Sequence, residues 1–328
     1  MIAQNITVLG AGAWGTALAL LVHQNGHHVT LWGHDPAHLA ELEREGTNDK
    51  YLPSILLPRD WRCEPDLIHA TTNAHLIILA VPSKAVRAVA ARLVGYTGPI
   101  ISVTKGIEAD TGLTMCGLIE QSVPTAQTAC LSGPSLALEV ARGIPTAVVA
   151  ASATEGLAAQ IQDLFHRPTF RVYASTDLVG VELGGALKNV VAIAAGVCDG
   201  LHFGDNAKAA LLTRALAEMT RLGIACGARA ETFSGLSGLG DLTVTCFSRL
   251  SRNRTFGERL GRGESVAALL AARTSVVEGY PTTRSAHELA LRLRVIAPVI
   301  HEVHAMLYAG KAPAAAVRDL LSREHRTE

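Results

Sequence analysis

The stretch Ile6-Thr7-Val8-Leu9-Gly10-Ala11-Gly12-Ala13-Trp14-Gly15-Thr16-Ala17-Leu18-Ala19-Leu20 decides the fold. A short apolar run typical of a β-strand leads into a Gly-x-Gly-x-x-Gly turn, and the turn opens a segment with helical spacing. Gly10, Gly12 and Gly15 permit a tight turn, a close approach of the backbone to a pyrophosphate, and close packing of the helix on the strand. Because the N–H groups at a helix N-terminus attract anions, this stretch predicts a dinucleotide site.

Outward from this turn, β-rich apolar runs alternate with helical patterns as far as about residue 175, as in a parallel sheet covered on both faces. Strands are predicted near 5–10, 28–33, 75–81, 99–103, 127–131, 145–150 and 169–173, with helices at 13–24, 84–94, 111–120 and 154–165. After about residue 178 the patterns are helical, at 178–198, 206–223, 253–261, 264–272, 281–293 and 297–309. The sequence thus predicts an α/β dinucleotide-binding domain over 1–177 and an all-helical domain over 178–328.

The composition excludes several classes of protein. The chain has 328 residues, 29 Lys and Arg against 29 Asp and Glu, 48% hydrophobic residues and a mean hydropathy of +0.25. Such a chain can bury two cores and is not disordered. A net charge of zero gives no long-range field for nucleic acid or an anionic membrane. We therefore expect a small-molecule partner, and no nucleic acid, held by a local cluster of charges.

The cysteines and the apolar runs predict the compartment. The six cysteines are scattered, without a C-x-x-C, which favours reduced thiols in a cytoplasmic protein. Glycines and the polar stretch at 23–28 interrupt the uncharged N-terminal run, so it does not resemble a signal peptide. The longest other apolar run, near Val190–Cys198, is much shorter than the roughly 20 residues of a membrane helix. The histidines show no ligand spacing, and we expect no metal.

A single lysine stands out in the second half. Lys188 lies in the middle of an apolar helical segment, where burying an ammonium group is costly. Helical side chains lean toward the N-terminus, so Gly184 and Gly185 would leave open space for a planar ligand around the amine. The sequence allows two interpretations, a catalytic lysine or a lysine that reaches water at the edge of its helix.

Three further segments carry polar groups suited to a ligand. Lys105 and the Ser132-Gly133-Pro134-Ser135 turn each follow a predicted strand, at the edge of the sheet where ligands of such folds bind. Asp241 ends a glycine-rich run. The stretch 249–254, with Ser251, Arg252 and Asn253, offers cations and amides for a phosphate. Taken singly, each has a structural alternative: a loop, a helix N-cap or a solvated face.

The end of the second predicted strand bears on the choice of cofactor. NAD enzymes usually place an acid there for the ribose 2′-hydroxyl, and NADP enzymes place a cation for the 2′-phosphate. This chain has His34 and then Asp35. Either His34 contacts a 2′-phosphate and Asp35 repels it, or both are ordinary turn residues, so NAD and NADP both stay open.

Across nearly its whole length the chain resembles the bacterial NAD(P)-dependent glycerol-3-phosphate dehydrogenases. The motifs that carry the resemblance are GAGAWGTALA at 10–19, NDKYLP at 48–53, AVPS at 80–83, TKGIE at 104–108, SGPSLALEVARGIPTAVV at 132–149, ELGGALKNVVAIAAGVCDGL at 182–201, GDNAKAALLTRALAE at 204–218, GLSGLGDLTVTC at 235–246, SRNRTFG at 251–257 and VEGYPT at 277–282. The resemblance implies a Rossmann-like domain followed by a helical one, interconversion of dihydroxyacetone phosphate and sn-glycerol 3-phosphate, a role in phospholipid synthesis, and a homodimer.

The resemblance also assigns roles to residues. It implies that Lys188 is the general acid/base, that the substrate is surrounded by Lys105, Gly133, Ser135, Asp241, Ser251, Arg252 and Asn253, and that cofactor contacts come from Ala13, Trp14, His34, Tyr51, Lys105, Ala137, Arg252, Val276 and Glu278. The family often has Arg at position 34, so the His here weakens a transfer of NADPH preference. A lysine acts near neutral pH only if its pKa falls from about 10.4. Burial and a cationic neighbour, for which Lys105 is the candidate, would lower it, while Asp241 would orient the amine or oppose the effect.

Two rival functions fit parts of the pattern. A related two-domain dehydrogenase acting on a hydroxy acid would use a similar Lys-Asn pair, with Arg252 and Asn253 binding a carboxylate. A catalytically idle dinucleotide sensor would keep the fold and signal through a partner. The presence of Lys105, Lys188 and Asp241 speaks against the sensor, since an idle protein would be free to lose them.

Overall fold

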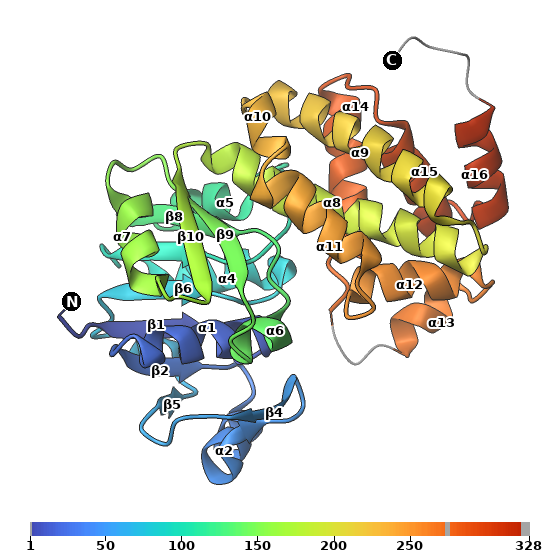
Figure 1. Cartoon of the computed structure of the whole chain (residues 1–328). Coiled ribbons are helices and arrows are strands. Elements are labelled where there is room, and N and C mark those ends of the chain that lie inside the picture. The colour runs from blue at the N-terminus through green and yellow to red at the C-terminus, as the bar shows by residue number, and fades with distance from the viewer. Residues whose placement is uncertain (1, 273–275, 323–328) are drawn as a thin grey trace. The chain divides into compact units, whose positions relative to one another are not determined.

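The computed structural model describes residues 2–272 and 276–322, which form two compact units (Figure 1). Unit 1 lies within residues 1–105 and 113–178, and unit 2 within 106–112 and 179–328. The short segment Gly106–Gly112 thus packs with the second unit, where Ile107 joins the apolar core and Arg292 donates a hydrogen bond to Thr111 O at 3.0 Å. The division predicted from the sequence, at 177/178, had left this segment in the first domain.

Unit 1 is built on one eight-stranded sheet. In spatial order its strands are β10 (Phe170–Ser175), β9 (Thr146–Ala151), β8 (Gln127–Ser132), β7 (Pro99–Ser102), β6 (Leu76–Leu79), β1 (Asn5–Leu9), β2 (His28–Trp32) and β5 (Arg62–Glu64). Side chains alternate between two cores, since Val8 and Ile78 belong to one and Leu9 and Leu79 to the other. Helices therefore cover both faces of the sheet, as the sequence predicts.

One pairing departs from the all-parallel sheet that the sequence predicts. β8 and β9 run antiparallel, while the other neighbours in the sheet are parallel. Only residues 133–145, with one short helix, connect β8 to β9, so the chain returns directly beside the strand it has left. A parallel neighbour would need a crossover that packs on one face of the sheet.

The helices of unit 1 include several that the sequence did not predict. They are α1 (Ala13–Gln24), α2 (Pro36–Glu45), α3 (Leu67–Thr71), the 3₁₀ turn η1 (Ser83–Ala85), α4 (Val86–Ala90), the 3₁₀ turn η2 (Ala91–Leu93), α5 (Met115–Ser122), α6 (Ala137–Ala141) and α7 (Leu157–Phe165). α2, α3 and α6 were not expected, and the helix predicted at 84–94 is divided into η1, α4 and η2. A small antiparallel pair, β3 (Thr47–Asn48) and β4 (Leu52–Leu56), and the edge strand β5 were also missed.

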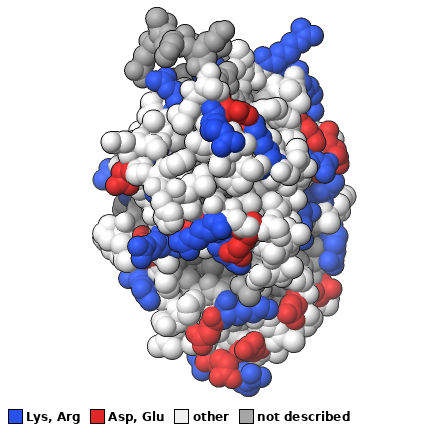
Figure 2. Space-filling view, turned by 90° about the vertical axis from the view of Figure 1, so that its right-hand side faces the viewer, with Lys and Arg blue, Asp and Glu red and all other residues white. Residues whose placement is uncertain are grey.

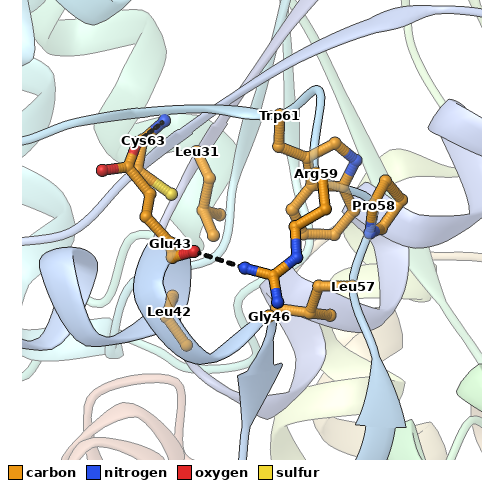
Figure 3. A pocket seen from close by; sticks show the side chains of 9 residues that line it. All are labelled: Leu31, Leu42, Glu43, Gly46, Leu57, Pro58, Arg59, Trp61 and Cys63. Atoms are coloured by element: carbon orange, nitrogen blue, oxygen red, sulfur yellow. Dashed lines mark hydrogen bonds between the residues drawn. The ribbon is translucent and has the colours of Figure 1, made fainter.

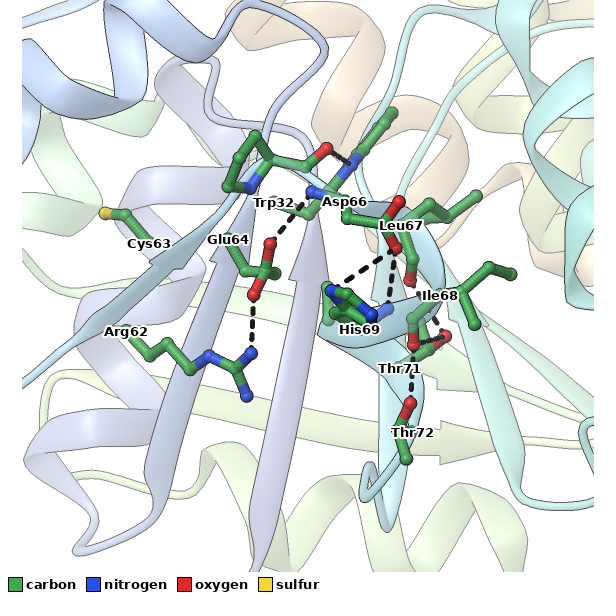
Figure 4. A network of polar contacts seen from close by, with 12 residues as sticks. Trp32, Arg62, Cys63, Glu64, Asp66, Leu67, Ile68, His69, Thr71 and Thr72 are labelled. Atoms are coloured by element: carbon green, nitrogen blue, oxygen red, sulfur yellow. Dashed lines mark hydrogen bonds and ion pairs between the residues drawn. The ribbon is translucent and has the colours of Figure 1, made fainter.

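A network of polar contacts holds the edge of the sheet together around β5 and α3 (Figure 4). The Glu64 carboxylate accepts hydrogen bonds from Arg62 and from the backbone N–H of Asp66, and Asp66 in turn accepts one from the backbone N–H of His69. Trp32 donates its indole N–H to Pro65 O at 2.9 Å. These bonds give partners to polar groups of the loop between β5 and α3 and of the first turn of α3.

Where the structure describes unit 2, its regular elements are helices, joined by loops. The helices are α8 (Leu178–Gly200), α9 (Asp205–Ala225), α10 (Ala230–Phe233), the π-helical turn η3 (Leu236–Gly240), α11 (Asp241–Phe247), α12 (Arg252–Gly261), α13 (Val266–Ala271), α14 (Gly279–Arg292), α15 (Pro298–Tyr308) and α16 (Pro313–Leu321). The six predicted helices are present, whereas α10, η3, α11 and α16 were not expected.

The central helix of unit 2 is α8. Its 23 residues contain an 18-residue window with a mean hydropathy of 1.5, which matches a membrane-spanning helix in length and composition, but 94% of that window is buried inside the protein. It is thus the core helix of unit 2.

On the face shown in Figure 2, Lys and Arg side chains are interspersed with Asp and Glu, in line with the balanced charge of the sequence.

Candidate active site

The glycine-rich turn between β1 and α1 has the shape of a phosphate cradle. Gly10 has φ +130°, and a Cβ there would lie 2.5 Å from Ala80 O; a Cβ on Gly15 would lie 2.0 Å from Gly10 O. In contrast, a Cβ on Gly12 would meet no atom within 4 Å, so the turn faces open space at this point. No side chain caps the N-terminus of α1. The turn therefore fits the pyrophosphate of a dinucleotide, with the N–H groups of the helix pointing toward the anion.

The side chain of Asn48 holds this turn in place through hydrogen bonds. Its amide N–H group donates to Ala11 O at 3.1 Å and to Thr16 Oγ1 at 2.8 Å, and the side chain is buried. No role for Asn48 was predicted from the sequence, although it begins the NDKYLP motif at 48–53. A buried polar residue in such a motif is the signal that would have identified it.

The structure separates the roles of His34 and Asp35. The carboxylate of Asp35 accepts hydrogen bonds from the backbone N–H groups of Ala37 (3.1 Å) and His38 (3.3 Å) at the N-terminus of α2. The bond from His38 is the main reason why the pKa of Asp35 lies below its usual range. Asp35 is therefore a helix cap, while His34 is exposed beside it. Tyr51 is half-buried, with its ring 5.2 Å from that of His38 in an edge-to-face contact.

The second polar group of unit 1 gathers at the carboxyl ends of β7 and β8. Lys105 Nζ donates to Gly133 O at 3.2 Å, and Ser135 Oγ donates to the same carbonyl at 2.9 Å. Gly133 has φ +145°, and a Cβ there would lie 2.9 Å from Val148 Cα. Ala137 opens α6 two residues after Ser135. The structure thus brings together three of the predicted substrate residues around one carbonyl.

In unit 2, Lys188 is buried in α8 with only 7% of its surface exposed. Its ammonium group donates to Asp241 Oδ1 at 2.8 Å and to Thr245 Oγ1 at 2.7 Å, and Asp241 is 1% exposed. Thr245 Oγ1 in turn donates to Asp241 Oδ1 at 3.2 Å. The interpretation of Lys188 as a side chain that reaches water at a helix edge is therefore wrong. Thr245 was missed, although its i+4 spacing from Asp241 on a helix is a usable signal.

The expectation of open space at Gly184 is wrong. A Cβ on Gly184 would lie 2.7 Å from Ser237 O, because the backbone of η3 packs directly against α8 at this point. The glycine is needed for this contact, which brings the start of α11, and with it Asp241, within reach of Lys188. The glycine-rich run at 235–240 forms the π-helical turn that makes the approach possible.

The predicted phosphate-binding residues form the first turn of α12. Ser251 caps this helix by accepting a hydrogen bond from the backbone N–H of Arg254 at 3.2 Å, and Arg252 is its exposed first residue. Asn253 is buried, and its amide N–H donates to Asn189 Oδ1 at 2.9 Å. The side-chain oxygen Oδ1 of Asn253 accepts a hydrogen bond from the backbone N–H of Gly279, also at 2.9 Å.

This amide chain links the helix of Lys188 to the start of α14. Glu278 precedes α14 and lies near enough to Arg252 for their charges to interact. Val276 is half-buried two residues earlier. The predicted residues therefore fall into clusters within each unit: the cradle and the Lys105 cluster in unit 1, and the Lys188 and α12 clusters in unit 2.

A cavity of about 150 Å³ in unit 1 involves none of the predicted site residues (Figure 3). It is lined by Leu31, Leu42, Glu43, Gly46, Leu57, Pro58, Arg59, Trp61 and Cys63. The guanidinium group of Arg59 is committed to the C-terminal carbonyls of α2, donating to Glu43 O at 2.8 Å and to two further carbonyls. In the part of the chain that the structure describes, no three His, Cys, Asp or Glu side chains are grouped to hold a metal ion.

Comparisons with known proteins identify the family. The family model for the N-terminus of NAD-dependent glycerol-3-phosphate dehydrogenase matches residues 5–158, and the model for its C-terminus matches residues 177–318. The NAD(P)+ glycerol-3-phosphate dehydrogenase of Anaeromyxobacter dehalogenans is 50% identical, over 98% of this chain and 99% of that protein. The enzyme of the same name from Chlorobium phaeobacteroides is 46% identical, over 98% of each chain.

A solved structure agrees with these relatives. The crystal structure of glycerol-3-phosphate dehydrogenase from Coxiella burnetii matches with a TM-score of 0.94 and 39% identity, over 98% of this chain and 99% of that one. Both the Rossmann-like unit and the helical unit are covered by the match. The chain therefore belongs to the NAD-dependent glycerol-3-phosphate dehydrogenase family.

Proposed function

We propose that this chain reduces dihydroxyacetone phosphate to sn-glycerol 3-phosphate with NADH or NADPH, in a reversible reaction. The observation that carries the proposal is the buried Lys188 ammonium group, held by Asp241 and Thr245. Such a charge is costly to bury and is expected where chemistry requires it. The reaction consumes one ketone, one reduced dinucleotide, which gives up a hydride, and one proton, and it yields one secondary alcohol and the oxidised dinucleotide.

The cofactor is held by the cradle of unit 1. Gly10, Gly12 and Gly15, with the uncapped N-terminus of α1, fit its pyrophosphate. Further contacts are assigned to Ala13, Trp14, His34, Tyr51, Lys105, Ala137, Arg252, Val276 and Glu278. When bound, the nicotinamide supplies the hydride that the C2 carbonyl accepts.

Lys188 is the general acid in the direction of reduction. As hydride reaches C2, negative charge develops on the carbonyl oxygen, and the ammonium group stabilises that charge and then donates a proton to the oxygen. Asp241 favours the charged form of its neighbour, so Lys188 begins this direction as an acid. In the oxidation of glycerol 3-phosphate, the neutral amine accepts the proton of the C2 hydroxyl.

The remaining polar residues hold the substrate in position. Arg252 and Asn253, with Ser251, are assigned to the phosphate, since a guanidinium group suits phosphate geometry. Lys105, Gly133 and Ser135 are assigned to the substrate from unit 1. Binding energy from the phosphate, which does not react, then serves to orient the ketone.

The preference between NADH and NADPH depends on His34 in this proposal. Asp35 is committed to the cap of α2, which leaves His34 as the exposed candidate beside the 2′ position.

The cellular role follows from the family. We assign the chain to the cytoplasm, where its product supplies phospholipid synthesis, and the six free cysteines suit a reducing compartment. A homodimer is part of this proposal.

The proposal is tested by the initial rate of nicotinamide absorbance loss with dihydroxyacetone phosphate, using NADH and NADPH in parallel. Lys188→Ala should lower kcat at least about a hundredfold, as expected for loss of an acid/base group, with near-normal cofactor binding. Arg318→Ala, which removes an exposed positive charge from α16 and none of the assigned site residues, is the control and should leave kcat unchanged. Retained turnover in Lys188→Ala contradicts the assigned role. Turnover of a hydroxy acid in place of the triose phosphate would favour the rival dehydrogenase.

A further inference from the structure

A cluster of charged side chains lies in unit 2 at the point where α8, α9 and α12 meet. Asp199, in the last turn of α8, forms ion pairs with Lys208 of α9 at 2.5 Å and with Arg254 of α12 at 2.6 Å. Arg254 also pairs with Glu258, one turn further along α12, at 3.3 Å. The side chains are largely buried: 7% of Lys208 is exposed, 11% of Arg254 and 15% of Asp199. Glu258 also pairs with Arg262, so three positive groups surround the two carboxylates of the cluster.

Two of these three helices, α8 and α12, are in direct backbone contact. A Cβ on Gly196 would lie 2.0 Å from Arg254 O, and a Cβ on Gly257 would lie 2.0 Å from Ile193 O. Gly200 and Gly261 make similar approaches one turn later. Figure 1 shows α12 beside the C-terminal half of α8. The distance between these helices is therefore set by backbone atoms. This contact does not by itself fix how far α12 is shifted along α8 or how α12 is rotated about its own axis.

The ion pair of Asp199 acts on the turn of α12 that carries the residues assigned to the phosphate. Arg254 follows Arg252 and Asn253 directly, and its backbone N–H donates to Ser251 Oγ. Its guanidinium group is anchored to α8, the helix that also carries Lys188. The end of α8 is in turn held to α9 through Lys208.

We propose that Asp199, acting through Arg254, is a positioning residue that fixes the first turn of α12 so that the substrate phosphate is held at the correct distance from Lys188. The inference rests on the proposed function and identifies what adapts the site to a substrate with its phosphate one carbon from the ketone. Asp199 contributes no group to the reaction. Asp199 therefore affects only the part of kcat/KM that comes from binding of the substrate phosphate.

The test compares dihydroxyacetone phosphate with dihydroxyacetone, which has the same ketone and no phosphate, in the full chain. Asp199→Asn should lower kcat/KM for the phosphorylated substrate about 30-fold, mainly through KM, and change kcat/KM for dihydroxyacetone less than about threefold. A purely structural role would lower both values by the same factor, through loss of folded enzyme. Equal losses, or no loss, overturn the proposal.

Two further variants keep the test decisive. Glu264→Gln breaks the exposed Arg259–Glu264 pair at the other end of α12 and should leave both substrates unaffected. If Asp199→Asn does not fold, Arg254→Lys replaces it: the charge stays, but a lysine does not reach Asp199 and Glu258 together as a guanidinium group does. It should show the same selective loss, about tenfold for the phosphorylated substrate. Failure of the wild-type chain to reduce dihydroxyacetone phosphate would instead reject the proposed function itself.

Discussion

Asp241 Oδ1 accepts a hydrogen bond from Lys188 Nζ at 2.8 Å, across 53 residues of sequence and between two helices of unit 2. The pair is buried, so each charge compensates the other in surroundings where either alone would be unfavourable. The position of the Lys188 amine therefore depends on the carboxylate of Asp241.

Asp241→Asn should lower kcat for reduction at least about tenfold, because the amide no longer favours the charged form of Lys188. The loss should be smallest at low pH, where solution protons keep the amine charged, and should grow as the pH rises. A pH–rate profile from pH 6 to 9 checks this. Loss of equal size at every pH would show that Asp241 serves only to position the amine.

Thr245→Val should leave the fold intact while removing a hydrogen-bond partner of Lys188. The substitution preserves the shape of the side chain but leaves one buried N–H bond of the ammonium unmade, at a cost of about 1–3 kcal/mol. We expect kcat to fall about three- to tenfold, with KM for the dinucleotide unchanged. Thr213→Val, at an exposed position of α9, is the matched control. An unchanged kcat would show that the hydroxyl group of Thr245 is not needed to hold the amine.

Gly12→Ala should weaken dinucleotide binding and leave stability nearly unchanged, whereas Gly10→Ala should lower the stability of the fold. A methyl group on Gly12 enters open space, so stability should change by less than about 0.5 kcal/mol, while dinucleotide affinity falls because the methyl group occupies the approach of the pyrophosphate. A methyl group on Gly10 meets Ala80 O at 2.5 Å with φ at +130°, so unfolding should become easier by about 2 kcal/mol or more. Thermal melts and titration of NADH fluorescence separate the two. Normal affinity in Gly12→Ala would place the pyrophosphate elsewhere.

Asp35→Ala should lower Tm at neutral pH, and the difference from wild type should disappear in acid. Hydrogen bonds from the N-terminus of α2 lower the pKa of this carboxyl in the folded state. Its contribution to stability is therefore complete above its pKa in the unfolded chain, near 3.9, and is lost as the pH falls through the lower folded value. Melts between pH 3 and 7 check this, with the exposed Asp163→Ala as control. A difference in Tm that is constant with pH would rule out the cap.

The parts of the fold that follow from local chemistry could be predicted from the sequence. The β1–turn–α1 unit depends on what Gly10, Gly12 and Gly15 permit, and α8 on a long apolar run, so both were found with nearly correct bounds. In contrast, the antiparallel β9 depends on which neighbour a strand finds in the folded sheet. The short strands β3 and β5 are too brief to show an alternating pattern.

The site shows the same division. Lys188 is conspicuous because a charge in an apolar helix needs an explanation. The neighbours that hold it were harder to find. The π-helical turn before Asp241 is set by backbone contact between η3 and Gly184, and the position of Thr245 only matters once that contact has formed. The distances that define the cluster are tertiary, and the spacing of the motifs along the chain does not contain them.

The segment Gly106–Gly112 limits how this protein can be divided. The chain passes from one unit to the other at 105/106, again at 112/113, and finally at 178/179. A fragment cut at residue 178 would lack Ile107 from the core of unit 2 and the carbonyl of Thr111 to which Arg292 donates. Residues 179–328 alone therefore do not make up the complete helical unit. A gene fusion or domain exchange at the apparent boundary would have to carry seven residues from the other half of the sequence with it.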